Sequence, residues 1–539
     1  MIIRLAICAS LLSCGGARGP KSSSHHADSE SNSDSALVGH SKLEELIATG
    51  QASAALQVAA QLERRGQDIS DETLGKLSQL VDRIPSGKLP SLEPSLAASL
   101  VLLRRSLLAL HAGDSDSAER YAQEAGQDPR LRQEWQGVLA RLRDRPNTID
   151  THKIAVLLPL SGDHAAIGRA FLDGISVAAL SDENVNLLIL DTQGSEEGAR
   201  EAVVRAAKAG CLLAIGPIGK YESAAAAFEA RVQRLPIAVL APTAGYADSK
   251  NVFRLVLSPA FEAEQAAIVA TELGFQSLAV LAPRDELGLL QANAFAASAR
   301  SLGVEVVMLG TYDPAAIDLE NDVRAFLNLN PKTNKRLRQH YRQYGRRSWK
   351  SFSPDIEFDL LYIPDRTARA ALVASYLPYF NVELESRDSV SPLSLRQKHG
   401  GRIPRIVQLM GSGAWLGGDL AARGGAAVEG ALIVSACPGG LELDVSEQAR
   451  EFRNEFRKHI GRPPPSASAH AYDAMTMVLA AHRRSLSGGG SGSRTGQELR
   501  AAILRDGVCG TLEVNGLGQV EGQIEVLRVL AGVPEIYEF

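Results

Sequence analysis

Between residues 151 and 539, short apolar runs alternate with segments of helical periodicity, and this alternation constrains the fold more than any other feature. The run 153–159 (KIAVLLP) is apolar after its opening lysine, and the run 186–191 (NLLILD) follows one helical segment later. Uninterrupted apolar runs are typical of strands that are buried on both faces of a parallel sheet. Regular alternation of such strands with helices predicts a doubly wound α/β sheet.

Further apolar runs extend this pattern into a second α/β unit. The first unit is completed by predicted strands at 211–216 and 236–241. After Phe253 and Arg254, strands are expected at 278–282, 304–309, 360–363, 405–409 and 431–435. Two α/β units in one stretch predict a two-lobed architecture with a cleft between the lobes.

The composition is that of a folded protein and excludes several classes of function. Apolar residues make up 45% of the chain and charged residues 22%, which is ordinary for globular proteins. A net charge of −5 gives no general attraction for nucleic acid. The sequence has no phosphate-binding loop, GxSxG, HExxH or Ser-x-x-Lys motif, so we expect no catalytic residues, no cofactor and no enzyme. The five cysteines form no CxxC pair and the histidines lack ligand spacing, so no metal site is expected.

The first residues predict export and a lipid anchor. Residues 1–13 combine Arg4 with a short apolar stretch, the layout of a signal peptide. The ending Leu-Leu-Ser before Cys14 resembles a bacterial lipobox, which implies lipidation of Cys14; a plain secretory signal is the alternative. Gly15 in place of an aspartate favours the outer membrane, with the protein facing the periplasm. Residues 14–40 are rich in Gly, Ser and Asp and predict a flexible tether.

Residues 41–145 predict an all-helical domain, because apolar residues recur there at helical spacing. Two stretches repeat one pattern of small residues, with Gly50, Ala55 and Ala59 in the first and Gly113, Ala118 and Ala122 in the second. The pattern resembles tetratricopeptide-type helical hairpins, and a generic helical bundle is the alternative. Either arrangement is a scaffold for contacts.

Several motifs in residues 151–539 together resemble type I periplasmic binding proteins of the leucine-binding kind. They are 154–162 (IAVLLPLSG), 216–217 (GP), 236–240 (PIAVL), 253–255 (FRL), 471–474 (AYDA) and 510–512 (GTL). With the lipobox and the helical domain, the chain resembles the penicillin-binding-protein activator lipoproteins. That resemblance implies a non-catalytic regulator of a peptidoglycan synthase. The alternative is a substrate-binding lipoprotein of an amino-acid or branched-chain transporter.

The resemblance also implies a ligand site in the cleft, with a small amino acid as the ligand. The matching positions in the first lobe are Ser161, Ser223, Thr243 and Tyr246. Ser223 and Thr243 are interpreted equally well as helix N-caps. No acid of the second lobe can be assigned to an amino group. Bulky residues at 220–222 (KYE) are expected to fill the cleft if the protein is an activator.

One basic cluster is a candidate partner-binding surface. Eight basic residues and no acids lie between 332 and 350, and four of them would form one stripe on a helix: Lys335, Arg338, Arg342 and Arg346. Such a stripe is suited to an acidic partner surface or polyanionic envelope material, and a solvated helix is the alternative.

The remaining expectations concern the cysteines and one polar segment. In an oxidising compartment Cys437 and Cys509 are candidates for a disulfide, because one ends a strand and the other opens a terminal hairpin. Cys211 begins a buried strand and is interpreted as an apolar filler. Residues 485–496 (SLSGGGSGSRTG) are expected to form a flexible surface loop.

Replacing Cys14 by Ala tests the anchor. Without the thiol that carries the lipid, the protein should be released as a soluble form or remain unprocessed. Membrane fractionation after a salt wash measures this, and a variant that still fractionates with the outer membrane would refute the lipobox interpretation.

Overall fold

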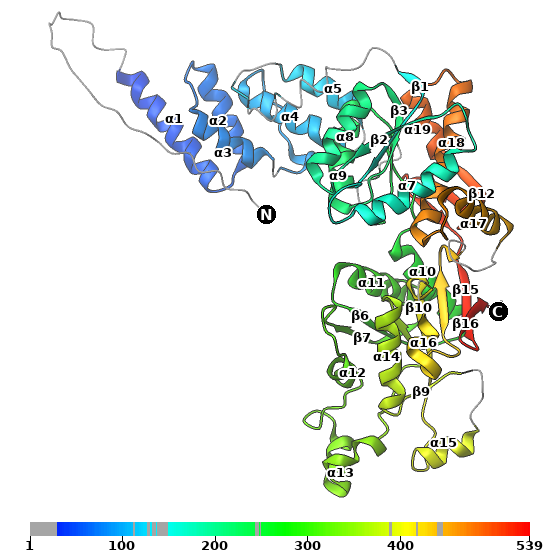
Figure 1. Cartoon of the computed structure of the whole chain (residues 1–539). Helices are drawn as coiled ribbons and strands as arrows, with labels where there is room; N and C mark the ends of the chain where they lie inside the picture. The colour runs from blue at the N-terminus through cyan, green and yellow to red at the C-terminus, as the bar shows by residue number, and fades with distance from the viewer. Residues whose placement is uncertain are drawn as a thin grey trace, which may run out of the picture. The chain divides into compact units, whose positions relative to one another are not determined.

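The computed structural model is drawn in Figure 1. It describes residues 30–82, 84–111, 114–126, 130–131, 136, 149–242, 247, 250–386, 391–416, 419–438 and 446–538. The chain divides into two compact units. Unit 1 comprises Met1–Arg105 and Tyr121–Gln133, and unit 2 comprises Ser106–Arg120 and Glu134–Phe539.

Unit 1 is helical, as the apolar spacing predicts. Gly50 has a φ of 72° and makes the corner between the first two helices. Ala55 and Ala59 are completely buried, so small side chains stand where those two helices pack together. The first helix begins at Glu30, inside the segment that was predicted as a tether. The helices that lie wholly or partly in unit 1 are α1 (Glu30–Ala48), α2 (Ala52–Arg64), α3 (Asp71–Val81), η1 (Ser86–Lys88), α4 (Leu96–His111) and α5 (Ser115–Glu124).

The first lobe of unit 2 is a parallel sheet in the order β2-β1-β3-β4-β5. Helices α7 and α18 pack on one face, and α8 and α9 cover the other. The five residues 154–158 of β1, which lies between β2 and β3, are completely buried, which explains their uninterrupted apolar run. The elements are β1 (Asp150–Leu158), α7 (Ala165–Ala179), β2 (Asn186–Asp191), α8 (Glu196–Lys208), β3 (Cys211–Ile215), α9 (Lys220–Gln233), β4 (Ile237–Val239), β5 (Val252–Arg254), α17 (Glu447–Ile460), α18 (Ser466–Ser487), α19 (Gly492–Arg500), β12 (Ile503–Gly507), β13 (Gly510–Val514) and β14 (Val520–Gly522).

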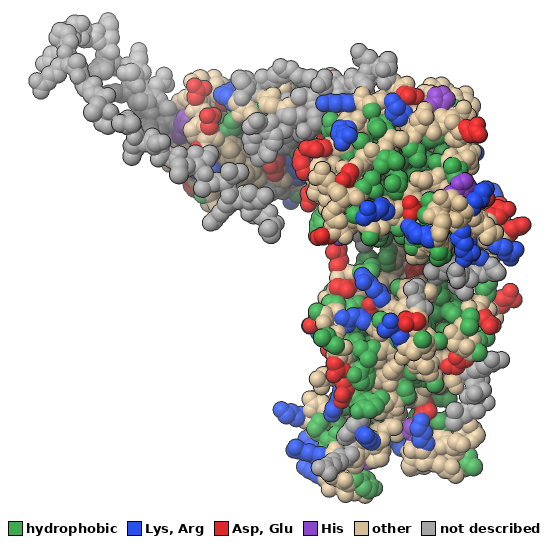
Figure 2. Space-filling view, in the orientation of Figure 1, with side chains coloured by type: hydrophobic (Ala, Val, Ile, Leu, Met, Phe, Trp, Pro, Cys, Tyr) green, Lys and Arg blue, Asp and Glu red, His purple; other side chains and the backbone are tan. Residues whose placement is uncertain are grey.

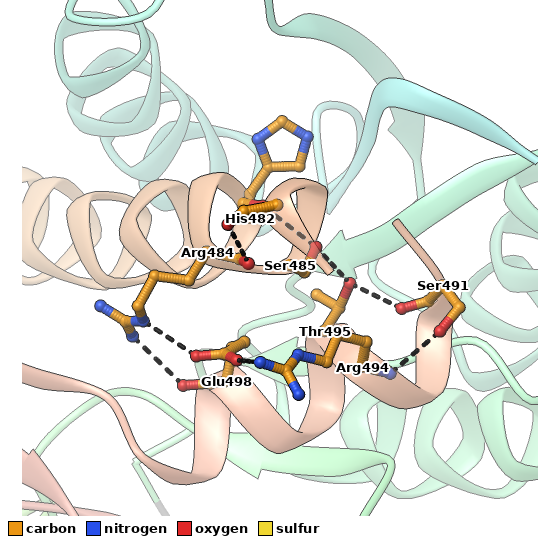
Figure 3. Close-up of polar contacts among 8 residues, drawn as sticks. His482, Arg484, Ser485, Ser491, Arg494, Thr495 and Glu498 are labelled. Atoms are coloured by element: carbon orange, nitrogen blue, oxygen red, sulfur yellow. Dashed lines mark hydrogen bonds and ion pairs between the residues drawn. The ribbon is translucent and has the colours of Figure 1, made fainter. Parts of the chain in front are cut away.

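The segment 485–496 is not the flexible loop that its composition suggests. Helix α18 continues to Ser487 and α19 begins at Gly492, so only a short turn separates them. Thr495 is completely buried and its hydroxyl donates to Ser485 Oγ at 3.0 Å (Figure 3). On the outer side, Glu498 forms ion pairs with Arg484 and Arg494. The glycine- and serine-rich composition predicted a flexible loop, because composition alone does not show which hydroxyls become buried.

The second lobe of unit 2 is a mixed sheet in the order β16-β15-β11-β10-β8-β6-β7, with β9 beside β10. Helices α10 and α11 cover one face, and α12, α13 and α14 cover the other. The elements are α10 (Pro259–Glu272), β6 (Ser277–Pro283), α11 (Glu286–Ser301), β7 (Glu305–Tyr312), α12 (Glu320–Phe326), α13 (Lys335–Tyr344), η2 (Arg346–Ser351), β8 (Leu360–Ile363), α14 (Thr367–Tyr379), β9 (Glu383–Leu384), α15 (Pro392–Lys398), β10 (Ile406–Ser412), η3 (Gly413–Trp415), α16 (Leu420–Gly424), η4 (Gly425–Ala427), β11 (Leu432–Ser435), β15 (Glu525–Leu530) and β16 (Val533–Ile536).

The two-lobed α/β fold predicted from the sequence is confirmed. The bounds of β2 and β8 coincide with the predicted runs. The chain passes between the lobes after β5, after β11 and after β14. Each helix that the structure describes is too short or too polar to cross a membrane.

Candidate functional site

A cavity of about 930 Å³ lies between the two lobes of unit 2. Its walls come largely from the segments that follow the carboxyl ends of the parallel strands, which is where α/β proteins usually bind ligands. Apolar side chains from both lobes alternate there with a few charged groups, a composition typical of small-molecule sites. The lining residues include His164, Ile167, Phe171, Ile218, Glu222, Leu240, Glu262, Asp285, Leu287, Gln291, Asp365, Arg366, Arg369, Ser412, Ala436 and His470.

The predicted ligand residue Ser161 does not line this cavity. It follows β1, and its hydroxyl donates to Asp191 Oδ2 at 2.6 Å. Burial alone would raise the pKa of Asp191, but the hydrogen bonds from Ser161 and from nearby backbone N–H groups hold it below its ordinary value. The hydroxyl is therefore engaged in the loop after β1. Thr243 and Tyr246, two other predicted ligand residues, lie outside the described residues.

Ser223 lies one turn inside α9 and not at its start. The helix begins at Lys220 with Gly219 at the N-cap position, so the interpretation of Ser223 as an N-cap is wrong. Its side chain is completely buried, and its hydroxyl donates to the carbonyl of Pro217 at 3.2 Å. Ser223 therefore holds the loop before α9 and does not line the cavity.

The three bulky residues at the start of α9 leave the cavity open, and the expectation that they would fill it is wrong. Lys220 forms an ion pair with Glu286 at the start of α11, and Tyr221 is 66% exposed. Only Glu222 lines the cavity, and its carboxylate accepts a hydrogen bond from Thr192 Oγ1 at 2.6 Å. Burial raises the pKa of Glu222 although the Thr192 hydroxyl opposes this shift.

The second lobe contributes an acid that the sequence left unassigned. Glu262, in the first turn of α10, accepts hydrogen bonds from the backbone N–H groups of Gly413 at 2.6 Å and Ala436 at 3.2 Å. A Cβ at position 413 would lie 2.6 Å from Ser435 Oγ, so glycine allows this close approach. Burial raises the pKa of Glu262 to about 7, against the lowering effect of the two N–H groups. The local sequence gave no signal for this role, because the two donors lie 151 and 174 residues away.

Other polar groups of the second lobe complete this wall of the cavity. Ser412 is 2% exposed, and its Oγ has no hydrogen-bond partner among the residues that the structure describes. Asp365 accepts hydrogen bonds from the Tyr312 hydroxyl at 2.5 Å and from the Arg366 N–H at 2.6 Å. Arg366 and Arg369 add positive charge to the cavity. These groups suit the binding of a small polar molecule between apolar walls.

The basic stripe lies on α13, with one correction. Gly345 has a φ of 83° and ends the helix, so Arg346 belongs to the following η2. Leu337 is 1% exposed and anchors α13 in the core of the second lobe. The exposed stripe residues, for which no ion pair is seen within the described ranges, are Lys335, Arg338, Arg342 and Arg346. Figure 2 shows Lys and Arg side chains gathered over this end of the second lobe.

The cysteines occupy two different environments. Cys437 and Cys509 are joined by a disulfide, the pairing for which the sequence offered candidates. His470, which lines the cavity, stands beside this bond. Burial lowers the pKa of His470 to about 4, so its ring is neutral near pH 7. Cys211 is a buried free thiol, and burial raises its pKa to about 11.

Comparison with solved structures identifies unit 2 as having the fold of the periplasmic binding proteins. A "putative branched-chain amino acid ABC transporter" from Rhodospirillum rubrum has 20% identity and a TM-score of 0.54, with 72% of this chain and 100% of that chain covered. A substrate-binding protein from Sphaerobacter thermophilus has 18% identity and a TM-score of 0.52, covering 71% and 95%. A solute-binding protein from Rhodopseudomonas palustris BisB5, solved with 3,4-dihydroxybenzoic acid, has 14% identity and a TM-score of 0.50, covering 73% and 97%.

Residues 145–382 match the family model described as "LppC putative lipoprotein". The lipoprotein family that the sequence resembled is therefore confirmed over this part of the chain. The search of curated proteins finds no match.

Replacing Glu262 by Gln tests the electrostatics of the cavity wall. The folded-state pKa of about 7 lies above the ordinary value of 4.5, so the protonated carboxyl favours the folded state. Its contribution to stability is full below pH 4.5 and is lost as the pH rises through 7. The thermal midpoint of the wild type should fall over this window relative to that of Glu262→Gln, as differential scanning calorimetry would measure.

The comparison between the two proteins isolates Glu262 from other groups. Asp473, whose pKa burial raises to about 7, is present in both and cancels in the difference. Glu305→Gln, an exposed change on β7, should keep the wild-type profile. Parallel pH profiles of the wild type and Glu262→Gln would contradict the assigned electrostatics.

Proposed function

We propose that this protein is a lipid-anchored, non-catalytic regulator that activates a peptidoglycan synthase of the penicillin-binding-protein class. The match to a lipoprotein family and the binding-protein fold support this role. Lipidation at Cys14 would hold the chain at the outer membrane, with the helical and two-lobed parts in the periplasm. The tetratricopeptide-like interpretation of residues 41–145 fits a scaffold for additional protein contacts.

The observation that carries this proposal is the group of exposed basic residues on α13 for which no ion pair is seen in the part of the chain that the structure describes. Lys335, Arg338 and Arg342 occupy one exposed side of a helix that Leu337 fixes from the other side. Because the helix that carries these charges is already fixed, its backbone need not be ordered when an acidic surface approaches. Such charges favour rapid and specific association. We assign this stripe, extended by Arg346, as the contact with the synthase.

Activation requires that the regulator bind the active state of the synthase more tightly than the inactive state. Differential affinity is the only way in which a bound protein shifts a conformational equilibrium. A coupling of about 1–3 kcal/mol would raise the active population by roughly 5–150-fold where that state is rare. Such a role needs no catalytic group and no cofactor in this chain.

A second candidate function is solute binding for a transporter, and the open cavity favours it. The cavity is large enough for a small organic molecule, and Ser412 offers an unused hydroxyl beside Glu262. The relative from Rhodospirillum rubrum is named as part of a branched-chain amino acid transporter. An amino acid is therefore the first ligand class to test.

Charge reversal on α13 tests the docking surface. Arg338→Glu combined with Arg342→Glu should weaken capture of the purified synthase at least tenfold, and the weakening should shrink as salt is raised. The reason is that exposed charges act through screened Coulomb attraction. Surface plasmon resonance at low and high salt would measure the effect, and loss of synthase stimulation should accompany it.

The matched control reverses the same number of charges on the first lobe. Arg169→Glu with Lys208→Glu changes the net charge equally at exposed positions of α7 and α8. If this control weakens capture as much as the α13 variant does, the stripe is not the contact.

Calorimetry distinguishes the two candidate functions. For a regulator we expect none of the common amino acids to bind with micromolar affinity, because Ser161 and Ser223 lie outside the cavity. Uptake from dilute solution requires micromolar binding or better. A micromolar titration with leucine or a related amino acid, weakened by Ser412→Ala, would support the transport function instead.

A further inference from the structure

Three soft or borderline metal ligands meet at one point behind the cavity, although they come from three separate segments. Cys437 follows β11, His470 lies in α18, and Cys509 lies in the turn between β12 and β13. Their donor atoms, two Sγ and one Nδ1, all lie within 4.8 Å of one another. Cys509 Sγ and His470 Nδ1 are 3.7 Å apart. Both cysteines are buried and His470 is half-buried.

We propose that reduction of the Cys437–Cys509 disulfide creates a Cys₂His site for Zn²⁺. Two thiols of an external reductant transfer two electrons and two protons to the disulfide and leave as their own disulfide. The chain then holds two thiols, which lose their protons when their sulfurs bind the metal. This site is independent of the proposed contact with a synthase.

The geometry of the histidine already fits tetrahedral zinc. Zn–S and Zn–N bonds of about 2.3 and 2.0 Å place neighbouring ligand atoms about 3.5–3.8 Å apart at tetrahedral angles. The observed Cys509–His470 separation of 3.7 Å is one such edge. Breaking the S–S bond would let the two sulfurs move apart toward a second edge of the same tetrahedron, with all three donor atoms already within 4.8 Å of one another.

The surroundings provide a rigid frame and an open fourth position. Asp473 accepts hydrogen bonds from the N–H groups of Val508 at 2.9 Å and Cys509 at 2.7 Å, which fixes the turn that carries one sulfur. His470 lines the cavity, as does Ala436, the residue before Cys437, so water or a cavity ligand can reach the metal. Three protein ligands with one open position are typical of reactive or exchangeable zinc sites.

The site also stands where the chain passes between the lobes. Cys437 lies in the segment from β11 to α17, and Cys509 belongs to the first lobe. The disulfide and the metal would each fasten this crossing segment to the first lobe, by a covalent bond in one state and by an exchangeable ligand set in the other. The local spacing rules missed the site because Cys437 and Cys509 are 72 residues apart.

Titration of the full mature chain with Zn²⁺ tests the proposal. Protein reduced with a phosphine should bind one equivalent with at least tenfold higher affinity than the oxidised protein, and zinc should raise the thermal midpoint of the reduced form. Co²⁺ in place of Zn²⁺ should give the thiolate charge-transfer absorption of a tetrahedral site. Isothermal calorimetry and absorption spectroscopy are the measurements.

Matched variants separate this site from adventitious binding. His470→Ala keeps both cysteines and should weaken zinc at least tenfold, whereas Cys211→Ser removes a remote thiol and should change nothing. Equal binding by oxidised and reduced protein would overturn the proposal, as would unchanged affinity in His470→Ala. Unfolding on reduction, seen by circular dichroism and not reversed by zinc, would also overturn it, because the site needs the folded frame.

Discussion

The two larger sheets of unit 2 are covered by helices on both faces, and this burial determines where charged groups can lie. Residues 154–158 of β1 are completely buried, as are 360–363 of β8. A charge inside such a strand would lose its hydration without a partner, at a cost of several kcal/mol. The charged side chains that line the cavity, such as Glu262, Asp365 and Arg366, lie in the segments beyond the strand ends. Since parallel strands end along one edge of each sheet, these segments meet around one cavity.

Buried charged groups also lie in the segments where the chain passes between the lobes. Glu262 ties the start of α10 to Gly413 after β10 and to Ala436 after β11. On the first-lobe side, buried Arg254 donates to Gln519 Oε1 at 2.7 Å and to the carbonyl of Val256 at 3.2 Å. These hydrogen bonds take the place of those that water would make with the buried carboxylate of Glu262 and the buried guanidinium of Arg254.

The fold could be predicted because its sequence signal is local. The site could not be predicted, because its contacts join residues that are far apart in the sequence. Buried strands appear as runs such as 360–363, whose bounds need no knowledge of distant residues. The role of Glu262 depends on N–H groups more than 150 residues away, and no local pattern reports it. Ser223 was interpreted as an N-cap, but the N-cap position is four residues earlier, at Gly219, so the Ser223 side chain is buried inside the helix. The basic stripe on α13 could be predicted because the spacing of its residues along a helix is also a local pattern.

The basic stripe on α13 and the cavity are joined through one strand. The segment between β7 and β8 carries α13 and η2, and β8 then runs directly to Asp365 and Arg366 at the cavity wall. Leu337 of α13 and Leu361 of β8 pack in the same core, so a displaced helix must either repack that core or move with the strand. Close-packed cores resist small continuous distortions. Movement of the helix together with β8 therefore costs less free energy than repacking the core. If the proposed partner displaced α13, the displacement would reach Asp365 and Arg366 after β8 and would alter the contacts of a molecule bound in the cavity. By reciprocity, occupancy of the cavity would change affinity at α13 by the same factor.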